Sequence, residues 1–136
     1  MAILGGAGNP VGGSFTGPAE ALEVIGNHHY AISGSISFSD SGEATMIDTQ
    51  TGNYYSKTLV QFGVPSATSG DVTTRVYFNG VQVMGHETND SASALLLDAL
   101  RLVIPPYTDV KVTIQLSSGS STAFCMMTGR IYRTRD

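Results

Sequence analysis

Cysteine is scarce and tryptophan is absent: the chain of 136 residues contains one cysteine, Cys125, and no tryptophan. A single cysteine cannot form an intrachain disulfide, so the fold is not held together by cross-links as many small secreted domains are. Cys125 lies in the apolar run AFCMMTG. We expect it to be a buried apolar side chain rather than a reactive thiol.

Charge is also scarce. Charged residues make up 13% of the chain, against about 25% in typical soluble domains. A surface with so little charge is suited to packing against neighbouring subunits. The net charge is −4 and the seven lysines and arginines are spread thinly, whereas nucleic-acid binding needs a concentrated basic face. We therefore expect no nucleic acid among the partners.

Long apolar segments are absent from the sequence. No run approaches the length of about 20 residues that a membrane-spanning helix needs. The N-terminal stretch MAILGGAGNPVGG lacks the basic start and the apolar core of a signal peptide. The sequence therefore predicts a soluble protein made in a cytoplasm, with no membrane partner.

Motifs that carry chemistry are missing as well. His28 and His29 are adjacent and so point to opposite faces of a strand, and no spaced ligand pair joins either of them to His86. The serines lack the G-x-S-x-G pattern of a nucleophile elbow, and the N-terminal glycines match neither a P-loop nor G-x-G-x-x-G. We expect no enzyme activity, no catalytic residue, no bound metal and no cofactor.

The strongest structural signal is a β-hairpin over residues 72–84. Asn79 and Gly80 form the dipeptide that best suits a type I′ turn, since both central positions of that turn need φ > 0. A two-residue turn pairs Phe78 with Val81 and Val76 with Val83, which directs these four apolar side chains to one face. The side chains expected on the opposite face are those of Arg75, Tyr77, Gln82 and Met84.

Further strands are predicted by alternation and by β-branched or aromatic residues. Their ranges are 28–38, 44–48, 54–62, 110–116 and 122–132. Residues 86–93 have the composition of a polar loop, and the segment 93–104 fits a helical turn followed by a strand, although period alone does not separate helix from strand there. The segment 122–132 is apolar on both sides, which predicts a central strand or an interface.

These patterns predict an all-β fold. About eight short strands separated by turns indicate a single antiparallel β-sandwich, with a jelly roll as the natural eight-stranded case. The first 20 residues are rich in glycine and proline and favour neither helix nor central strand. We expect an extended N-terminal arm over residues 1–20 and one sandwich domain over residues 21–136.

The C-terminal half carries a resemblance to a known family. The segments LVIPPYTDVKVTIQL, residues 102–116, and MTGRIY, residues 127–132, combine a proline-ended apolar segment, an alternating strand and a terminal Gly-Arg-aromatic strand. This pattern resembles the small β-sandwich decoration, or cement, proteins of tailed bacteriophage capsids. The resemblance implies a structural protein of the virion, made in the host cytoplasm. Its partners would be other copies of itself, as a dimer or trimer, and a major capsid protein.

The interface residues expected for such a role come from three places: the apolar side chains of the arm, the outer face of the hairpin and the C-terminal arginines. They are Ile3, Leu4, Val11, Phe15, Arg75, Tyr77, Gln82, Met84, Arg130, Arg133 and Arg135. The alternative is a carbohydrate- or receptor-binding module of a viral fibre or spike. In that case exposed tyrosines would stack on sugars, and the candidates are Tyr54, Tyr55, Tyr77 and Tyr107.

Overall fold

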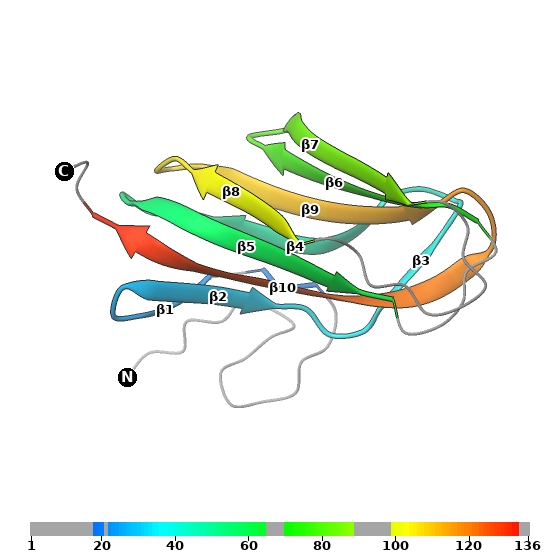
Figure 1. Cartoon of the computed structure of the whole chain (residues 1–136), viewed down its shortest axis with the longest axis horizontal. Coiled ribbons are helices and arrows are strands. Elements are labelled where there is room, and N and C mark those ends of the chain that lie inside the picture. Colours follow the sequence, from blue (N-terminus) through cyan, green and yellow to red (C-terminus); the bar gives the residue numbers. More distant parts are fainter. Residues whose placement is uncertain (1–17, 21, 65–69, 89–98, 134–136) are drawn as a thin grey trace.

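The computed structural model describes residues 18–20, 22–64, 70–88 and 99–133 (Figure 1). These residues form ten β-strands and no helix, so none of them belongs to a helix that could cross a membrane. The strands make two sheets in which every pairing between strands is antiparallel. The predicted all-β, single antiparallel sandwich is confirmed, with ten strands in the described residues in place of about eight.

Each sheet has a defined strand order. The six-stranded sheet runs in the order β1 (Glu23–Ile25), β2 (His28–Ile32), β10 (Ser120–Tyr132), β5 (Tyr55–Gly63) and β8 (Leu100–Ile104), and β3 (Ile36–Ser39) also pairs with β10. The four-stranded sheet runs in the order β4 (Ala44–Gln50), β9 (Asp109–Leu116), β6 (Val72–Phe78) and β7 (Val81–Thr88).

The chain passes back and forth between the two sheets. β4 lies in the smaller sheet and β5 in the larger one, the β6–β7 hairpin returns to the smaller sheet, and β8, β9 and β10 alternate again. The resulting orders, β2-β10-β5-β8 and β4-β9-β6-β7, are those of a jelly roll. β10 is a central strand, as its two-sided apolar pattern predicts.

Alternating side chains build the core between the sheets. The inward residues of β9 are buried as their pattern predicts, and the facing sheet contributes the buried side chains of β5 and β10, Met127 among them. Complete burial of one such aliphatic side chain contributes about 1.5 to 3 kcal/mol. The inward residues of β9 are Val110, Val112, Ile114 and Leu116.

The hairpin has the predicted turn but a different register. Asn79 and Gly80 have φ angles of 52° and 83°, which confirms the type I′ turn. A β-bulge then pairs Val76 with Met84, which leaves Val83 as the extra residue of β7. Met84 therefore packs against the core, while Val83 is 49% exposed and Val81 is also exposed. The predicted faces of Val83 and Met84 are wrong, because the bulge shifts the alternation by one position. Val81 keeps its predicted partner Phe78, but it is exposed on the edge strand β7 where a buried side chain was expected.

Two other predicted ranges are corrected. Residues 86–88, expected in a loop, extend β7 because they pair with residues 72–74 of β6. The range 28–38 is two strands, because the chain leaves the strand at Ser33, whose hydroxyl accepts a hydrogen bond from the Cys125 amide at 2.9 Å. The break changes the alternation, so His29 and Ala31 are buried in β2, where the opposite residues were expected to share the face of Ile36 and Phe38.

The arm meets the sandwich at Ala19. Its amide donates to the carbonyl of Met46 at 2.9 Å and its carbonyl accepts from the amide of Asp48 at 2.8 Å, which adds a short parallel bridge to the edge of β4. Residues 1–17 of the predicted arm lie outside the described residues. Within the range 93–104, the described residues 100–104 form the strand β8.

Candidate functional site

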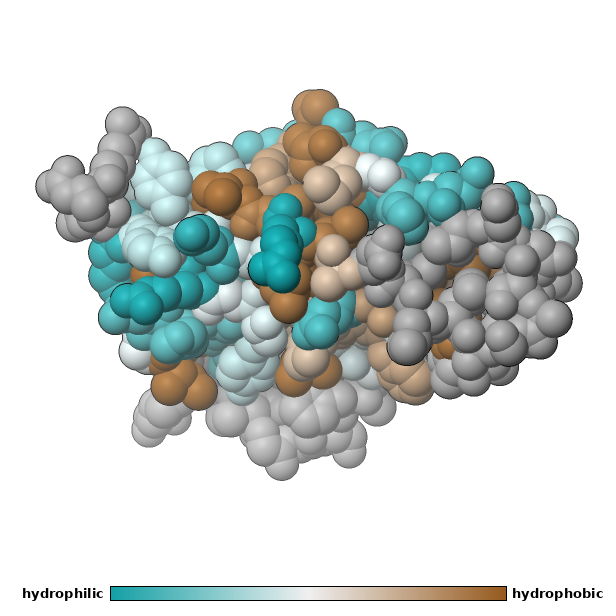
Figure 2. All heavy atoms as spheres, in the orientation of Figure 1, coloured by the Kyte–Doolittle hydropathy of each residue, from teal (hydrophilic) through white to brown (hydrophobic). Residues whose placement is uncertain are grey.

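The outer face of the six-stranded sheet, formed by β2, β10, β5 and β8, exposes large apolar side chains. Phe124 and Met126 of β10 are 45% and 37% exposed, and Val103 of β8 is 62% exposed. Met126 lies opposite Ile32 of β2 and Gln61 of β5, so that the central strand carries the middle of the face. Figure 2 shows hydrophobic side chains gathered in the middle of the molecule, with hydrophilic ones between them.

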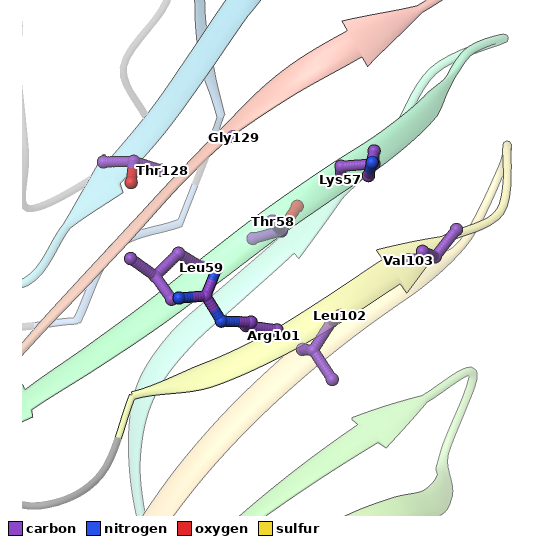
Figure 3. Close-up of a pocket in the computed structure, with 8 residues that line it drawn as sticks. All are labelled: Lys57, Thr58, Leu59, Arg101, Leu102, Val103, Thr128 and Gly129. Atoms are coloured by element: carbon purple, nitrogen blue, oxygen red, sulfur yellow. The ribbon is translucent and has the colours of Figure 1, made fainter.

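Three cations share this face with the apolar side chains. Lys57 lies opposite Arg130 on one side and Val103 on the other, and Arg101 lies opposite Leu59. A shallow hollow of about 380 Å³ lies between Lys57 and Arg101, and Figure 3 shows Arg101 reaching from β8 toward Leu59 on β5. None of the three cations forms an ion pair with a described residue.

A second hollow on this face is mostly apolar. It has a volume of about 310 Å³ and lies around Ile32, Gly63, Phe124 and Met126. Cys125 borders it but is itself buried, and this burial raises the pKa of its thiol far above the ordinary value. The expected character of Cys125, a buried apolar side chain, is confirmed.

The outer face of the four-stranded sheet, formed by β4, β9, β6 and β7, is polar and centred on Glu43. Glu43 Oε1 accepts hydrogen bonds from Thr113 Oγ1 at 2.5 Å and from the Tyr77 hydroxyl at 2.7 Å. It also lies 3.5 Å from Arg75 Nη1. The hydrogen bond from Thr113 is the main reason why the pKa of Glu43 is lowered; partial burial acts in the opposite direction.

A polar groove of about 440 Å³ runs beside Glu43 and is bordered by Asp48, Asp109 and Lys111. Asp48 lies opposite Lys111 in the register of β4 and β9. Partial burial, followed by the nearby negative charge of Asp109, raises the pKa of Asp48. The groove therefore carries more negative than positive charge.

The predicted interface residues that the structure describes lie on more than one surface. Arg75, Tyr77 and Gln82 lie on the outer face of the four-stranded sheet, whereas Met84 points to the core. Arg130 lies on the other sheet, 5.5 Å above the ring of Tyr132. The remaining expected residues of the arm and the C-terminus, except Arg133, fall outside the described residues: Ile3, Leu4, Val11, Phe15 and Arg135.

Arg133 lies 6.0 Å from the ring of Tyr54. Tyr54 is buried and cannot serve as an exposed stacking surface, which corrects its place among the sugar-binding candidates. Tyr107 is 70% exposed and keeps that role open.

A polar cluster lies inside the sandwich. His29 Nε2 is hydrogen-bonded to the hydroxyl of Ser56 and lies 3.2 Å from that of Thr58, and His29 is only 2% exposed. Burial lowers the pKa of His29 to about 4. His28 lies on the opposite face of the strand, as predicted, and is exposed. Because Ser56 is completely buried, a substrate cannot reach its hydroxyl, and the cluster is interpreted as part of the core.

Sequence reasoning missed Phe124, Met126, Lys57 and Arg101 as surface candidates. The signal for the first two was present, because the terminal segment is apolar on both sides. No three His, Cys, Asp or Glu side chains of the described ranges gather where they could hold a metal ion. Comparison with protein-family models and with curated proteins finds no match to the chain.

Proposed function

We propose that the chain is a structural virion protein, a decoration (cement) or minor capsid subunit that binds and stabilises a capsid shell through contacts between subunits. The observation that carries this proposal is the exposed apolar face of the six-stranded sheet around Phe124 and Met126. Contiguous exposed apolar surface marks interaction sites. The cores of protein interfaces are enriched in aromatic residues, methionine and arginine, and this face combines all three.

Two further features support an assembly role. The chain is poor in charge, with 13% charged residues, and so has a surface that loses little hydration when it is covered. The jelly roll is an architecture of viral capsid domains, although lectin domains share it, so the fold alone does not separate the two roles. The chemistry of the exposed face favours burial against protein.

The experiment starts with virus particles from the source of the chain, purified on a density gradient and probed with an antiserum against the purified protein. We expect the protein in the particle fraction. Particles stripped of it should bind added wild-type protein, and the Phe124→Ser/Met126→Ser variant should bind at least about tenfold less because it loses apolar interface area. The matched control is Val81→Ser, which changes an exposed apolar residue of the other sheet. Absence from the particles would contradict the proposal.

A carbohydrate- or receptor-binding module of a fibre or spike is the second candidate, and Tyr107 favours it. The Tyr107 ring is exposed at a tight turn with φ of 54°, an uncommon value for a residue with a side chain. The turn is held by the Tyr107 amide, which donates to the Gly52 carbonyl at 2.8 Å. A glycan-array signal that is lost in Tyr107→Ala, but kept in the Phe124→Ser/Met126→Ser variant, would support this candidate.

A further inference from the structure

We propose that copies of this chain associate head to tail, so that the outer face of the six-stranded sheet in one copy covers the outer face of the four-stranded sheet in the next. This head-to-tail contact rests on the proposed function, in which the outer face of the six-stranded sheet is an assembly surface. The charge, the size and the symmetry of the two faces point to a second copy as the partner.

The two faces have opposite charge. The outer face of the six-stranded sheet carries Lys57, Arg101 and Arg130, and the acidic residue found in the strands of that sheet, Glu23, is buried. The outer face of the four-stranded sheet carries more acidic than basic side chains. Its acidic residues are Glu43, Asp48, Glu87 and Asp109, and its basic residues are Arg75 and Lys111.

Neither excess of charge is balanced within the described part of the chain. Arg75 forms an ion pair with Glu43. Lys111 is then the remaining basic residue of this face among the described residues, and it lies beside two carboxylates, those of Asp48 and Asp109. On the other sheet, the cations have no ion-pair partner among the described residues. A second copy supplies the missing opposite charge to both faces, and such complementarity steers association and selects the orientation.

The two faces are also similar in size. β2, β10, β5 and β8 on one sheet and β4, β9, β6 and β7 on the other are four hydrogen-bonded strands each, or roughly 19 Å at about 4.8 Å per strand, and the short β1 lies beyond the edge of the first set. Along the central strands, the stretches from Phe124 to Arg130 and from Asp109 to Gln115 each cover six residue steps, or about 20 Å at roughly 3.4 Å per step. Both sheets have the same hand of twist, and sheets twisted alike stack face to face with their strands nearly aligned.

Charge disfavours the simpler symmetric dimer. If the six-stranded face met a second copy of itself, the interface would contain Lys57, Arg101 and Arg130 twice without an exposed acidic side chain from the strands of that sheet, and such like-charge repulsion opposes association. The contact between the two different faces is heterologous. Repeated contacts of this kind produce a closed ring or an open filament, according to the rotation between successive copies.

The experiment is sedimentation velocity on the full chain over a range of concentrations. We expect species larger than a dimer at about 0.01 M salt and their dissociation at about 1 M, where the Debye length falls from about 30 Å to about 3 Å. Two variants each neutralise charges on one face: Lys57→Gln/Arg101→Gln on the six-stranded sheet and Asp48→Asn/Asp109→Asn on the four-stranded sheet. All four side chains are exposed, so the variants should keep the wild-type circular dichroism and melting temperature.

Each variant alone should be monomeric where the wild type associates, and an equimolar mixture should form a 1:1 heterodimer that does not grow, because one complementary pair of faces remains. Asp40→Asn, which removes an exposed charge in the turn between β3 and β4, is the control and should associate like the wild type. A chain that stays monomeric at every salt concentration, a dimer that survives in both variants, or a mixture without heterodimer would each overturn the inference. Monomeric protein that is still present in virus particles would overturn it while leaving the proposed function intact.

Discussion

The imidazole of His29 on β2 meets the hydroxyl of Ser56 on β5 across β10, the strand that lies between them. The contact is possible because β10 carries a glycine there: Gly129 pairs with His29 on one side and with Thr58 on the other. The Ser56 hydroxyl also lies 2.5 Å from that of Thr58. Side chains of two non-adjacent strands thus join into one buried polar cluster.

The cluster predicts a dependence of stability on pH. Burial lowers the pKa of His29 from 6.5 to about 4, so between these values the unfolded chain binds more protons than the folded one. The unfolding free energy is therefore highest above pH 6.5 and falls as the pH is lowered toward 4, by at most about 3 kcal/mol from this residue. Urea unfolding of the wild type and of His29→Gln at several pH values in this window measures the effect, as the difference between the two proteins in how steeply the unfolding free energy changes with pH. An unchanged pH dependence of the unfolding free energy in His29→Gln would contradict the prediction.

Gly129→Ala should destabilise the fold through the same cluster. A Cβ atom at this position would lie 2.7 Å from His29 Nε2 and 2.9 Å from Thr58 Oγ1, and closer still to a backbone carbonyl of β5. Overpacking of this kind costs about 1 to 3 kcal/mol. The matched control is Gly63→Ala, also in the six-stranded sheet, where the nearest atom is a ring carbon of Phe124 at 4.0 Å. Equal unfolding free energies for the two variants would contradict the reported close approach.

Gly80→Val tests the hairpin turn. The φ of Gly80 is 83°, which a β-branched residue adopts only with strain of about 1 to 2 kcal/mol. We therefore expect a lower melting temperature. Asn79→Asp is the control, since aspartate tolerates φ > 0 and keeps the oxygen that accepts from the Asp109 amide at 2.8 Å. A melting temperature of Gly80→Val equal to that of the wild type would argue against the turn.

Much of the fold could be predicted from local signals, and the errors have one physical origin. The turn at Asn79 and Gly80 has a chemical signature, but the bulge at Val83 has none, because Val83 and Met84 are both apolar and either could face the core. The break at Ser33 has no local signature either: its amide and its hydroxyl both hydrogen-bond to the backbone of Cys125, which is far along the chain and cannot be located by periodicity.

The candidate surface shows the same limit. The apolar pattern of residues 122–132 predicted a strand with two apolar sides, and the exposure of Phe124 and Met126 fits it. The residues of this strand do not determine whether another segment of the chain covers its outer side. The grouping of Lys57 with Arg101 depends on the pairing of β5 with β8, which joins segments that lie far apart in the sequence.

Removal of residues 1–17 tests the predicted arm, which lies outside the described residues. The variant keeps Ala19 and its bridge to β4, so we expect a folded sandwich with the wild-type circular dichroism. We expect incorporation into particles to be abolished, because the apolar side chains of Ile3, Leu4, Val11 and Phe15 would no longer reach a neighbouring subunit. Binding to stripped particles is the measurement. Normal incorporation of the truncated chain would contradict the role of the arm.

The turn that contains Tyr107 is held by hydrogen bonds of Thr51, and the nearby Thr49 is the matched control for a Thr→Val substitution. The buried Thr51 hydroxyl donates to the Pro105 carbonyl at 2.9 Å and accepts from the amide of Thr108, also at 2.9 Å. Thr51→Val would leave this buried amide without a partner, which costs about 1 to 3 kcal/mol. Thr49 Oγ1 is also buried but has no hydrogen-bond partner among the described residues, so Thr49→Val should be neutral or stabilising. Urea unfolding of both variants measures the difference, and equal losses would show that the hydrogen bonds of Thr51 do not hold the turn.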